Sequence, residues 1–207
     1  ASYTAHWSEH PDRDDAWANQ ERSKIGEERF LREHECKFIT ADETLISSMI
    51  LQHLSGVDPI RRLGQIRVYN EIQKDKTYVI AWDPSLGTGG DSAAIEVLSL
   101  PELTQVAEWQ HNKTDVRGQL RMLIAMAEWI KSEGIENDKI YWSVENNTLG
   151  EAALVAISEY GEERIPGFFL SEPGKTRKGF NTTAKSKLAA CTKLKYYLES
   201  NKMKLLS

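Results

Sequence analysis

The chain has 207 residues, of which 40% are hydrophobic and 28% charged, and its formal net charge at pH 7 is −5. This composition is typical of a soluble globular protein with room for one ordinary domain and an extension, and it excludes a disordered chain. No stretch approaches 18 consecutive apolar residues and the N-terminal sequence lacks a secretory pattern, so we expect neither a membrane-spanning nor a secreted protein.

The N-terminal quarter of the chain predicts short helices. Residues 12–36 are dense in charge and carry Trp17, Ile25 and Phe30 at helix-like spacing. The stretch "DETLISSMILQHLSG" predicts another short helix that ends at its final glycine, and the Asp58–Pro59 pair that follows marks a break.

The pattern then changes to one typical of strands. Four segments are rich in β-branched and aromatic residues or have strand length, and turns that contain Gly or Pro separate them. Because the connections are short, the region predicts a meander of three antiparallel strands. The segments are 66–72, 76–83, 92–100 and 103–111.

Helices and strands alternate beyond the meander. Asp115 is placed to cap a helix whose apolar residues keep to one 3.6-residue face and which ends near Gly134. The resulting order, β-β-β-α-β-α-β-α, predicts an α/β fold in which each crossover through a helix gives right-handed parallel pairing. The later elements are strand 139–145, helix 149–161, strand 165–170 and helix 183–200.

Two acidic residues, Asp83 and Glu145, end predicted strands. If the strand ending at Glu145 returns beside the strand ending at Asp83, the two carboxylates lie side by side at one sheet edge. Carboxylates that close repel in an apolar setting, so one takes up a proton or a divalent cation lies between them. Mg²⁺ suits such hard oxygen ligands. The alternative for Asp83 is a turn-capping aspartate before Pro84.

Neighbouring polar residues allow two interpretations each. Asp91 follows two glycines and is either a further acid of the site or ordinary turn chemistry. Asn146 and Asn147 either orient Glu145 or cap the next helix.

The remaining candidate ligands indicate structural roles. The histidines show no ligand spacing tied to an acid cluster, which indicates that they are structural. Cys36 and Cys191 show no metal or redox spacing, which indicates inert, partly buried thiols in a reducing compartment. Trp109, Trp129 and Trp142 lie inside predicted elements, which indicates core positions.

Positive charge is concentrated at the C-terminal end. Between Pro173 and Ser207 nine Lys or Arg residues face one acid, so this segment carries +8 and the rest of the chain −13. A basic segment fits a polyanion-binding face and also a solvated lysine-rich helix. We expect the Gly-, Pro- and Thr-rich stretch from Glu172 to Thr183 to be an exposed, mobile loop. If the segment binds a polyanion, the residues expected to contact it are Lys175, Arg177, Lys178, Lys185 and Lys187.

Three stretches carry a resemblance to a known family. "WDPSLGTGGD", the strand ending "VENNTLGEA", and the upstream "HPDRDDAWANQERSKIGEERFLREHECKF" followed by "TLIS" resemble the large terminase subunit of tailed bacteriophages, the DNA-packaging motor. In that family a packaging ATPase precedes a nuclease of ribonuclease H-like fold. The resemblance implies that residues 1–60 are the tail of the ATPase domain and the linker. It implies that 61–207 form the nuclease domain, a mixed sheet of three antiparallel and then parallel strands flanked by helices.

The resemblance also assigns catalytic roles. Asp83 matches the first metal-binding acid, Glu145 the second, and Asp91 the further acid of the Gly-rich turn. Mg²⁺ is the expected cofactor, and Mn²⁺ can substitute for it. The family's third metal-binding acid lies beyond Ser207, so we expect the nuclease domain as given to be C-terminally incomplete and to hold at most one weakly bound cation.

No nucleotide-binding motif is present in the sequence. The segment "PGKT" has Phe169 where a phosphate-binding loop needs its first glycine, and "GTGGDS" is followed by a strand instead of a helix. ATP is therefore expected only for an ATPase core that this chain lacks.

The resemblance implies a metal-dependent endonuclease that cuts concatemeric double-stranded DNA when phage genome packaging starts and ends, with the loop Glu172–Thr183 and the five basic residues named above as its DNA-binding part. By resemblance, its partners are DNA, the portal protein and the small terminase subunit, without a membrane. Its expected location is the host cytoplasm, transiently docked on the prohead. A resolvase- or transposase-like nuclease is the second enzyme interpretation, and a non-catalytic DNA-binding or hinge module is the alternative from another class.

Overall fold

The computed structural model describes residues 13–25, 30, 34, 46, 50, 51, 54, 56–147 and 149–207. The chain divides into two compact units, Ala1–His53 and Leu54–Ser207.

The N-terminal unit contains helix α1 (Asp15–Ile25), within the region where sequence predicts short helices. The Asp14 carboxylate accepts a hydrogen bond of 2.8 Å from the backbone N–H of Trp17, which caps the first turn. The Trp17 ring lies 6.1 Å from Phe30 and 5.2 Å from His34, so aromatic contacts join the helix to later residues. The helix predicted for "DETLISSMILQHLSG" falls almost entirely outside the described residues.

The larger unit is built on one seven-stranded mixed sheet with strand order β1-β2-β5-β4-β3-β6-β7. Pairing is antiparallel from β1 through β5, β4 and β3, and parallel from β3 to β6 and from β6 to β7. This arrangement confirms the predicted α/β class with antiparallel strands followed by parallel ones. The strands are β1 (Arg61–Leu63), β2 (Ile66–Val68), β3 (Thr77–Asp83), β4 (Ala93–Leu100), β5 (Thr104–His111), β6 (Ile140–Val144) and β7 (Phe168–Phe169).

The sheet has more strands than the five expected from sequence. The segment 66–72 is a strand only over 66–68, where it forms β2, and its hairpin partner β1 was not among the segments named from sequence. Three-residue strands are too short to show a period-2 pattern, which explains why sequence did not separate them.

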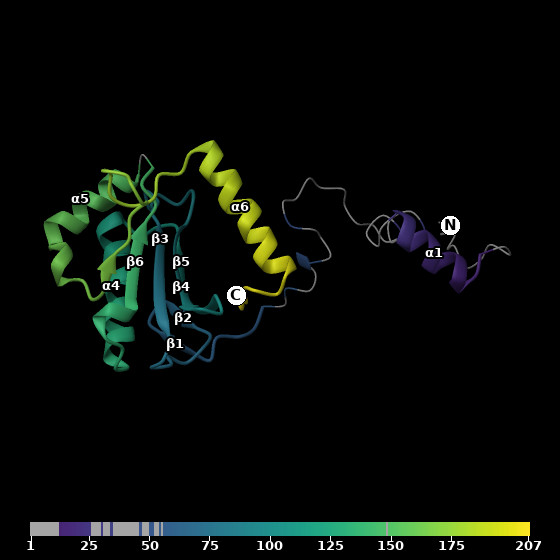
Figure 1. The fold of residues 1–207 in the computed structure, drawn as a ribbon. Coiled ribbons are helices and arrows are strands. Elements are labelled where there is room, and N and C mark those ends of the chain that lie inside the picture. The colour runs from purple at the N-terminus through teal and green to yellow at the C-terminus, as the bar shows by residue number, and fades with distance from the viewer. Residues whose placement is uncertain are drawn as a thin grey trace. The chain divides into compact units, whose positions relative to one another are not determined.

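The helices cover the two faces of the sheet unequally. Figure 1 shows α4 (Val116–Ser132) and α5 (Gly150–Tyr160) on one face and α6 (Ala184–Glu199) on the other side. Asp115 caps α4 as predicted, since its carboxylate accepts a 2.8 Å hydrogen bond from the N–H of Gly118. Two 3₁₀ turns, η2 (Asn137–Lys139) and η3 (Glu162–Arg164), complete the elements. None of the described helices is long and apolar enough to cross a membrane.

The hydrophobic core lies between the sheet and the pair α4 and α5. Alternate residues of β3, Tyr78, Ile80 and Trp82, are buried on this face, so the next residue, Asp83, points to the other. Trp109, Trp129 and Trp142 are also buried, as their positions in the sequence predict. By contrast, only Leu198 of α6 is buried, so α6 lies over the sheet with little apolar contact.

Candidate metal centre

Asp83 and Glu145 meet at the carboxyl ends of two neighbouring strands. β3 and β6 pair in parallel with Trp82 opposite Val144, and the backbone N–H of Glu145 donates a 2.9 Å hydrogen bond to the carbonyl of Trp82. Asp83 directly follows Trp82 in the chain, and Glu145 directly follows Val144. The register of the sheet therefore places the two carboxyl groups side by side, as their strand-end positions predict.

The two carboxyl groups interact strongly. The pKa of Asp83 is raised from its usual 3.8 to about 7, first because the group is partly buried, then because Glu145 contributes a hydrogen bond and a negative charge. Lys187 opposes this rise and Asp91 adds to it slightly. Two adjacent carboxyl groups that take up a proton near neutral pH can bind a divalent cation in place of that proton. The donor set thus fits a hard cation such as Mg²⁺.

The turn after Asp83 is fixed by a buried glutamine, Gln119 of α4. Its side-chain carbonyl accepts hydrogen bonds of 3.2 Å from the Trp82 indole N–H and 3.2 Å from the Ser85 backbone N–H. Its amide group donates bonds of 2.7 Å each to the carbonyls of Ser85 and Thr114. The Ser85 amide therefore bonds to Gln119 and not to Asp83, which does not support a turn-capping role for Asp83.

Asp91 stands at the other end of the same turn. Its side chain is exposed, and its negative charge adds to the rise in the pKa of Asp83, after the larger effects of burial and Glu145. Within the residues that the structure describes, no cluster of three or more His, Cys, Asp or Glu side chains is assembled for a metal. A direct metal-binding role for Asp91 stays a prediction.

Glu145 is fixed from its other side by the chain that leads into α6. Phe180 lies beside it in a parallel bridge: the Phe180 N–H donates 3.0 Å to the Val144 carbonyl, and the Asn146 N–H donates 2.7 Å to the Phe180 carbonyl. The fully buried Asn146 side chain donates a 2.7 Å bond to the carbonyl of Lys178. Asn147 instead caps α5 by accepting from the N–H of Leu149 at 3.0 Å. The two asparagines therefore have different roles.

Two glycines allow this close approach of backbone segments. Gly179 has a φ of +80°, and a Cβ there would lie 2.6 Å from the carbonyl oxygen of Val144. At Gly150 an added Cβ would lie 2.1 Å from the carbonyl oxygen of Glu145. Any side chain at either position would push its segment away from the residue that carries the acid.

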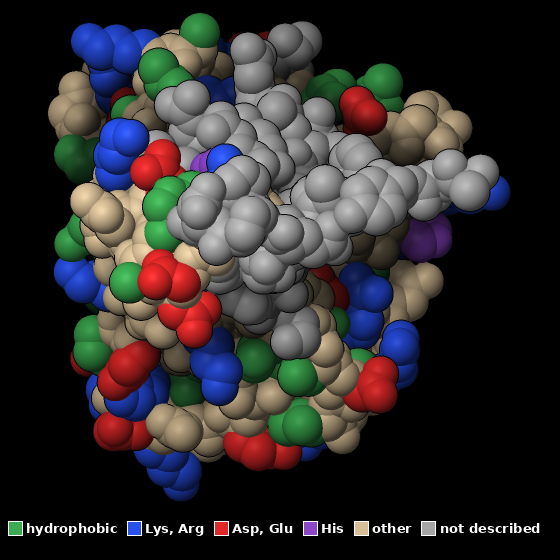
Figure 2. Space-filling model, turned by 90° about the vertical axis from the view of Figure 1, so that its right-hand side faces the viewer, with side chains coloured by type: hydrophobic (Ala, Val, Ile, Leu, Met, Phe, Trp, Pro, Cys, Tyr) green, Lys and Arg blue, Asp and Glu red, His purple; other side chains and the backbone are tan. Residues whose placement is uncertain are grey.

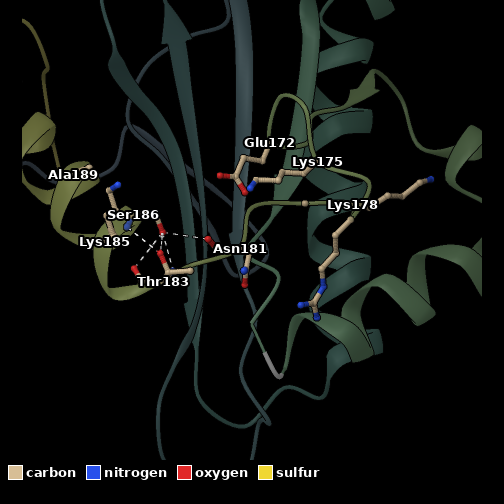
Figure 3. A pocket seen from close by; sticks show the side chains of 10 residues that line it. Glu172, Lys175, Lys178, Asn181, Thr183, Lys185, Ser186 and Ala189 are labelled. Atoms are coloured by element: carbon tan, nitrogen blue, oxygen red, sulfur yellow. Dashed lines mark hydrogen bonds between the residues drawn. The ribbon is translucent and has the colours of Figure 1, made fainter.

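The predicted DNA-binding residues divide between two cavities. Lys187 lines a cavity of about 400 Å³ together with Asp83, Glu145 and residues of α6. The other four line an adjoining cavity of about 470 Å³, which shares Glu172, Asn181 and Ser186 with the first and whose wall includes the first turn of α6 (Figure 3). These four are Lys175, Arg177, Lys178 and Lys185.

Not all of these basic side chains are available to a ligand. Arg177 forms an ion pair with Glu151, and Lys178 forms one with Glu162, so α5 and η3 supply neighbouring acids. The stretch Glu172–Thr183 is largely exposed, as predicted, apart from the buried Gly179. On the face shown in Figure 2, basic and acidic side chains are interspersed over the described surface. The described part of that face therefore shows no single continuous basic patch.

The family model described as "Terminase RNaseH-like domain" matches residues 80–207, which include both acids and the basic loop. The chain belongs to this family. The resemblance noted in the sequence is therefore confirmed. Among curated proteins, no sequence matches the chain.

Solved structures with low sequence identity share the terminase ribonuclease H-like fold. The large terminase nuclease from thermophilic phage G20c with bound magnesium has a TM-score of 0.58 and 17% identity, over 79% of this chain and 74% of that one. The zinc-bound form of the same nuclease has a TM-score of 0.54 and 17% identity, over 73% of this chain and 76% of that one. The large terminase nuclease domain of Thermus phage P74-26 has a TM-score of 0.52 and 17% identity, over 73% of this chain and 67% of that one.

The sequence did not identify two residues that shape this terminase ribonuclease H-like site. Gln119 and Gly179 hold the segments around the acids through contacts that join distant parts of the chain. Gln119 interrupts the apolar face of a helix, and a buried polar residue at such a position was the one available signal.

Proposed function

We propose that this domain is a metal-dependent endonuclease of a phage large terminase, and that it cuts concatemeric double-stranded DNA when packaging starts and ends. The observation that carries the proposal is the meeting of Asp83 and Glu145 at one sheet edge, where burial and Glu145 raise the pKa of Asp83. Family membership and the metals named in the G20c structures support it. The expected partners remain DNA, the portal protein and the small terminase subunit, with the domain docked transiently on the prohead in the host cytoplasm.

In this proposal, Asp83 and Glu145 hold the cation, and Asp91 contributes negative charge from the adjoining turn. Mg²⁺, or Mn²⁺ in its place, would supply Lewis acidity to the phosphate and to the attacking water. The reaction is hydrolysis: the water oxygen forms a bond to phosphorus, the bond from phosphorus to the 3′ oxygen breaks, and the leaving oxygen gains the proton that water loses. The basic loop holds the DNA backbone without reading its sequence.

The domain assignment also remains a proposal. Residues 1–60 are proposed to be the tail of a packaging ATPase domain and the linker, and 61–207 the nuclease domain. ATP would then be a cofactor of the ATPase core and would have no binding site among these acids.

Cleavage of supercoiled plasmid tests the function. With its weakly held cation, the chain should cut plasmid slowly, faster with Mn²⁺ than with Mg²⁺ and not with EDTA, and Asp83→Ala and Glu145→Ala should abolish cutting. Asp138→Ala is a matched control, because Asp138 is an exposed acid before the opposite end of β6. A folded chain that binds DNA but does not cut it with either metal would favour the non-catalytic module, and cutting by Glu145→Ala would remove this acid pair from the reaction.

A further inference from the structure

Lys187 differs from the other basic residues of its segment in the groups that it faces. It lines the same cavity as Asp83 and Glu145, and its positive charge acts on Asp83. Lys185, two residues earlier, lines the cavity of the basic loop instead. Two lysines of similar sequence context therefore have different surroundings.

The helix geometry explains this division. Successive residues of an α-helix turn by about 100°, so Lys185 and Lys187 point about 200° apart around the axis of α6. Residues one turn further along follow the same rule. Ala190 and Cys191, three and four positions after Lys187, line the acid cavity, and Ala189, four positions after Lys185, lines the other cavity. One face of α6 thus lies toward the acids and the opposite face toward the basic loop.

The start of α6 is held in place by local hydrogen bonds. Thr183 and Ser186 form a capping box, and the backbone N–H of Lys187 donates a 2.8 Å bond to the Thr183 carbonyl. Figure 3 shows the bonds among these side chains at the beginning of the helix. The backbone from which Lys187 extends is therefore fixed relative to Phe180 and Glu145, which lie a few residues upstream and across the bridge.

We propose that the Lys187 ammonium is a catalytic group of this nuclease: it compensates the charge of the acid pair when no cation is present and contacts the phosphate that is cut when DNA is bound. This inference rests on the proposed function. A cation and an ammonium that share two carboxylates compete electrostatically, whereas an anionic phosphate that enters the site draws the ammonium toward itself. Lys185 and the residues around it would instead hold phosphates away from the cut.

This assignment predicts opposite effects of one substitution on two measurements. Lys187→Met removes the competing charge, so Mn²⁺ should bind the DNA-free chain more tightly, by about threefold or more, in an isothermal titration. The same change should slow single-turnover plasmid cleavage at saturating DNA by about 100-fold, as expected for loss of one group that stabilises the transition state. Lys187→Arg, which keeps the charge, should leave Mn²⁺ binding closer to that of the wild type.

Lys185→Met is the matched control for charge, since it removes one lysine from the opposite face of the same helical turn. Its Mn²⁺ titration should match that of the wild type. An unchanged Mn²⁺ affinity in Lys187→Met would overturn the inference, and so would a cleavage defect that saturating DNA restores. If Lys187→Met gives either of these results while the wild type binds Mn²⁺ and cuts DNA, the proposed nuclease function stands and only the role of Lys187 fails. If the wild type binds no Mn²⁺ at all, both the nuclease function and the role of Lys187 fail.

Discussion

Replacing Asp83 by asparagine should make the metal-free domain more stable while it removes a cation ligand. Asp83 has a pKa of about 7 in place of 3.8, so its ionised form is disfavoured in the folded state. Below pH 3.8 the Asp83 carboxyl is protonated in both the folded and the unfolded state, so its raised pKa does not change the free energy of unfolding. As the pH rises from 3.8 to about 7 the raised pKa lowers that free energy progressively, and above about 7 the full destabilisation is present. Asparagine carries no such penalty at any pH.

The size of this gain follows from the shift and from solvent exposure. A difference of about three pK units corresponds to about 4 kcal/mol for a group shielded from water. Asp83 is only partly buried and keeps contact with solvent, so screening reduces the expected gain to about 1–2 kcal/mol. For a unit of this size, such a gain raises the melting temperature by about 2–8 °C.

Urea unfolding in EDTA, followed by tryptophan fluorescence at about pH 5 and about pH 8.5, measures the effect. The stability difference between Asp83→Asn and the wild type should increase with pH, and Asp91→Asn should show a smaller difference because Asp91 acts on Asp83 only weakly. Added Mn²⁺ should stabilise the wild type and not Asp83→Asn. A variant that is less stable than the wild type at both pH values would refute the account of repulsion within the acid pair.

Three further predictions concern the segments around the acids. Gly179→Ala should lower the free energy of unfolding by more than about 1 kcal/mol, measured in urea, because Gly179 has a φ of +80° and no space for a Cβ; a neutral result would contradict the close approach to Val144. Gln119→Leu should cost about 3 kcal/mol in the same assay, since it leaves the buried Trp82 indole and the Ser85 backbone without partners; equal stability would show that the turn is held otherwise. Lys175→Gln should reduce the log–log salt slope of DNA binding by about 0.9, whereas Lys178→Gln should reduce it less because Lys178 is paired with Glu162; fluorescence anisotropy across salt concentrations would detect the reverse order.

The acid pair could be predicted from sequence because its position depends on simple rules. Asp83 and Glu145 each follow a strongly apolar strand, and a helical crossover between strands implies parallel pairing in the same sheet. The register observed between β3 and β6 then brings the two residues together. The cap at Asp115 was predictable for a similar reason, since it depends on residues only three positions apart.

The surroundings of the pair could not be predicted in the same way. Sequence shows that Lys185 and Lys187 point in different directions but not which of them meets the acids, because that depends on how α6 lies over the sheet. The ion pairs of Arg177 and Lys178 join residues 26 and 16 positions apart, and no local pattern marks them. Charge alone therefore overestimated how much of the basic segment is available to DNA.

Anomalous scattering from crystals soaked in Mn²⁺ tests the central claim most directly. The account predicts a peak between Asp83 and Glu145, about 2 Å from an oxygen atom of each carboxylate, and no such peak in Glu145→Gln. Mn²⁺ peaks elsewhere, with Asp83 and Glu145 still hydrogen-bonded to each other, would contradict the assignment of this pair as the metal centre.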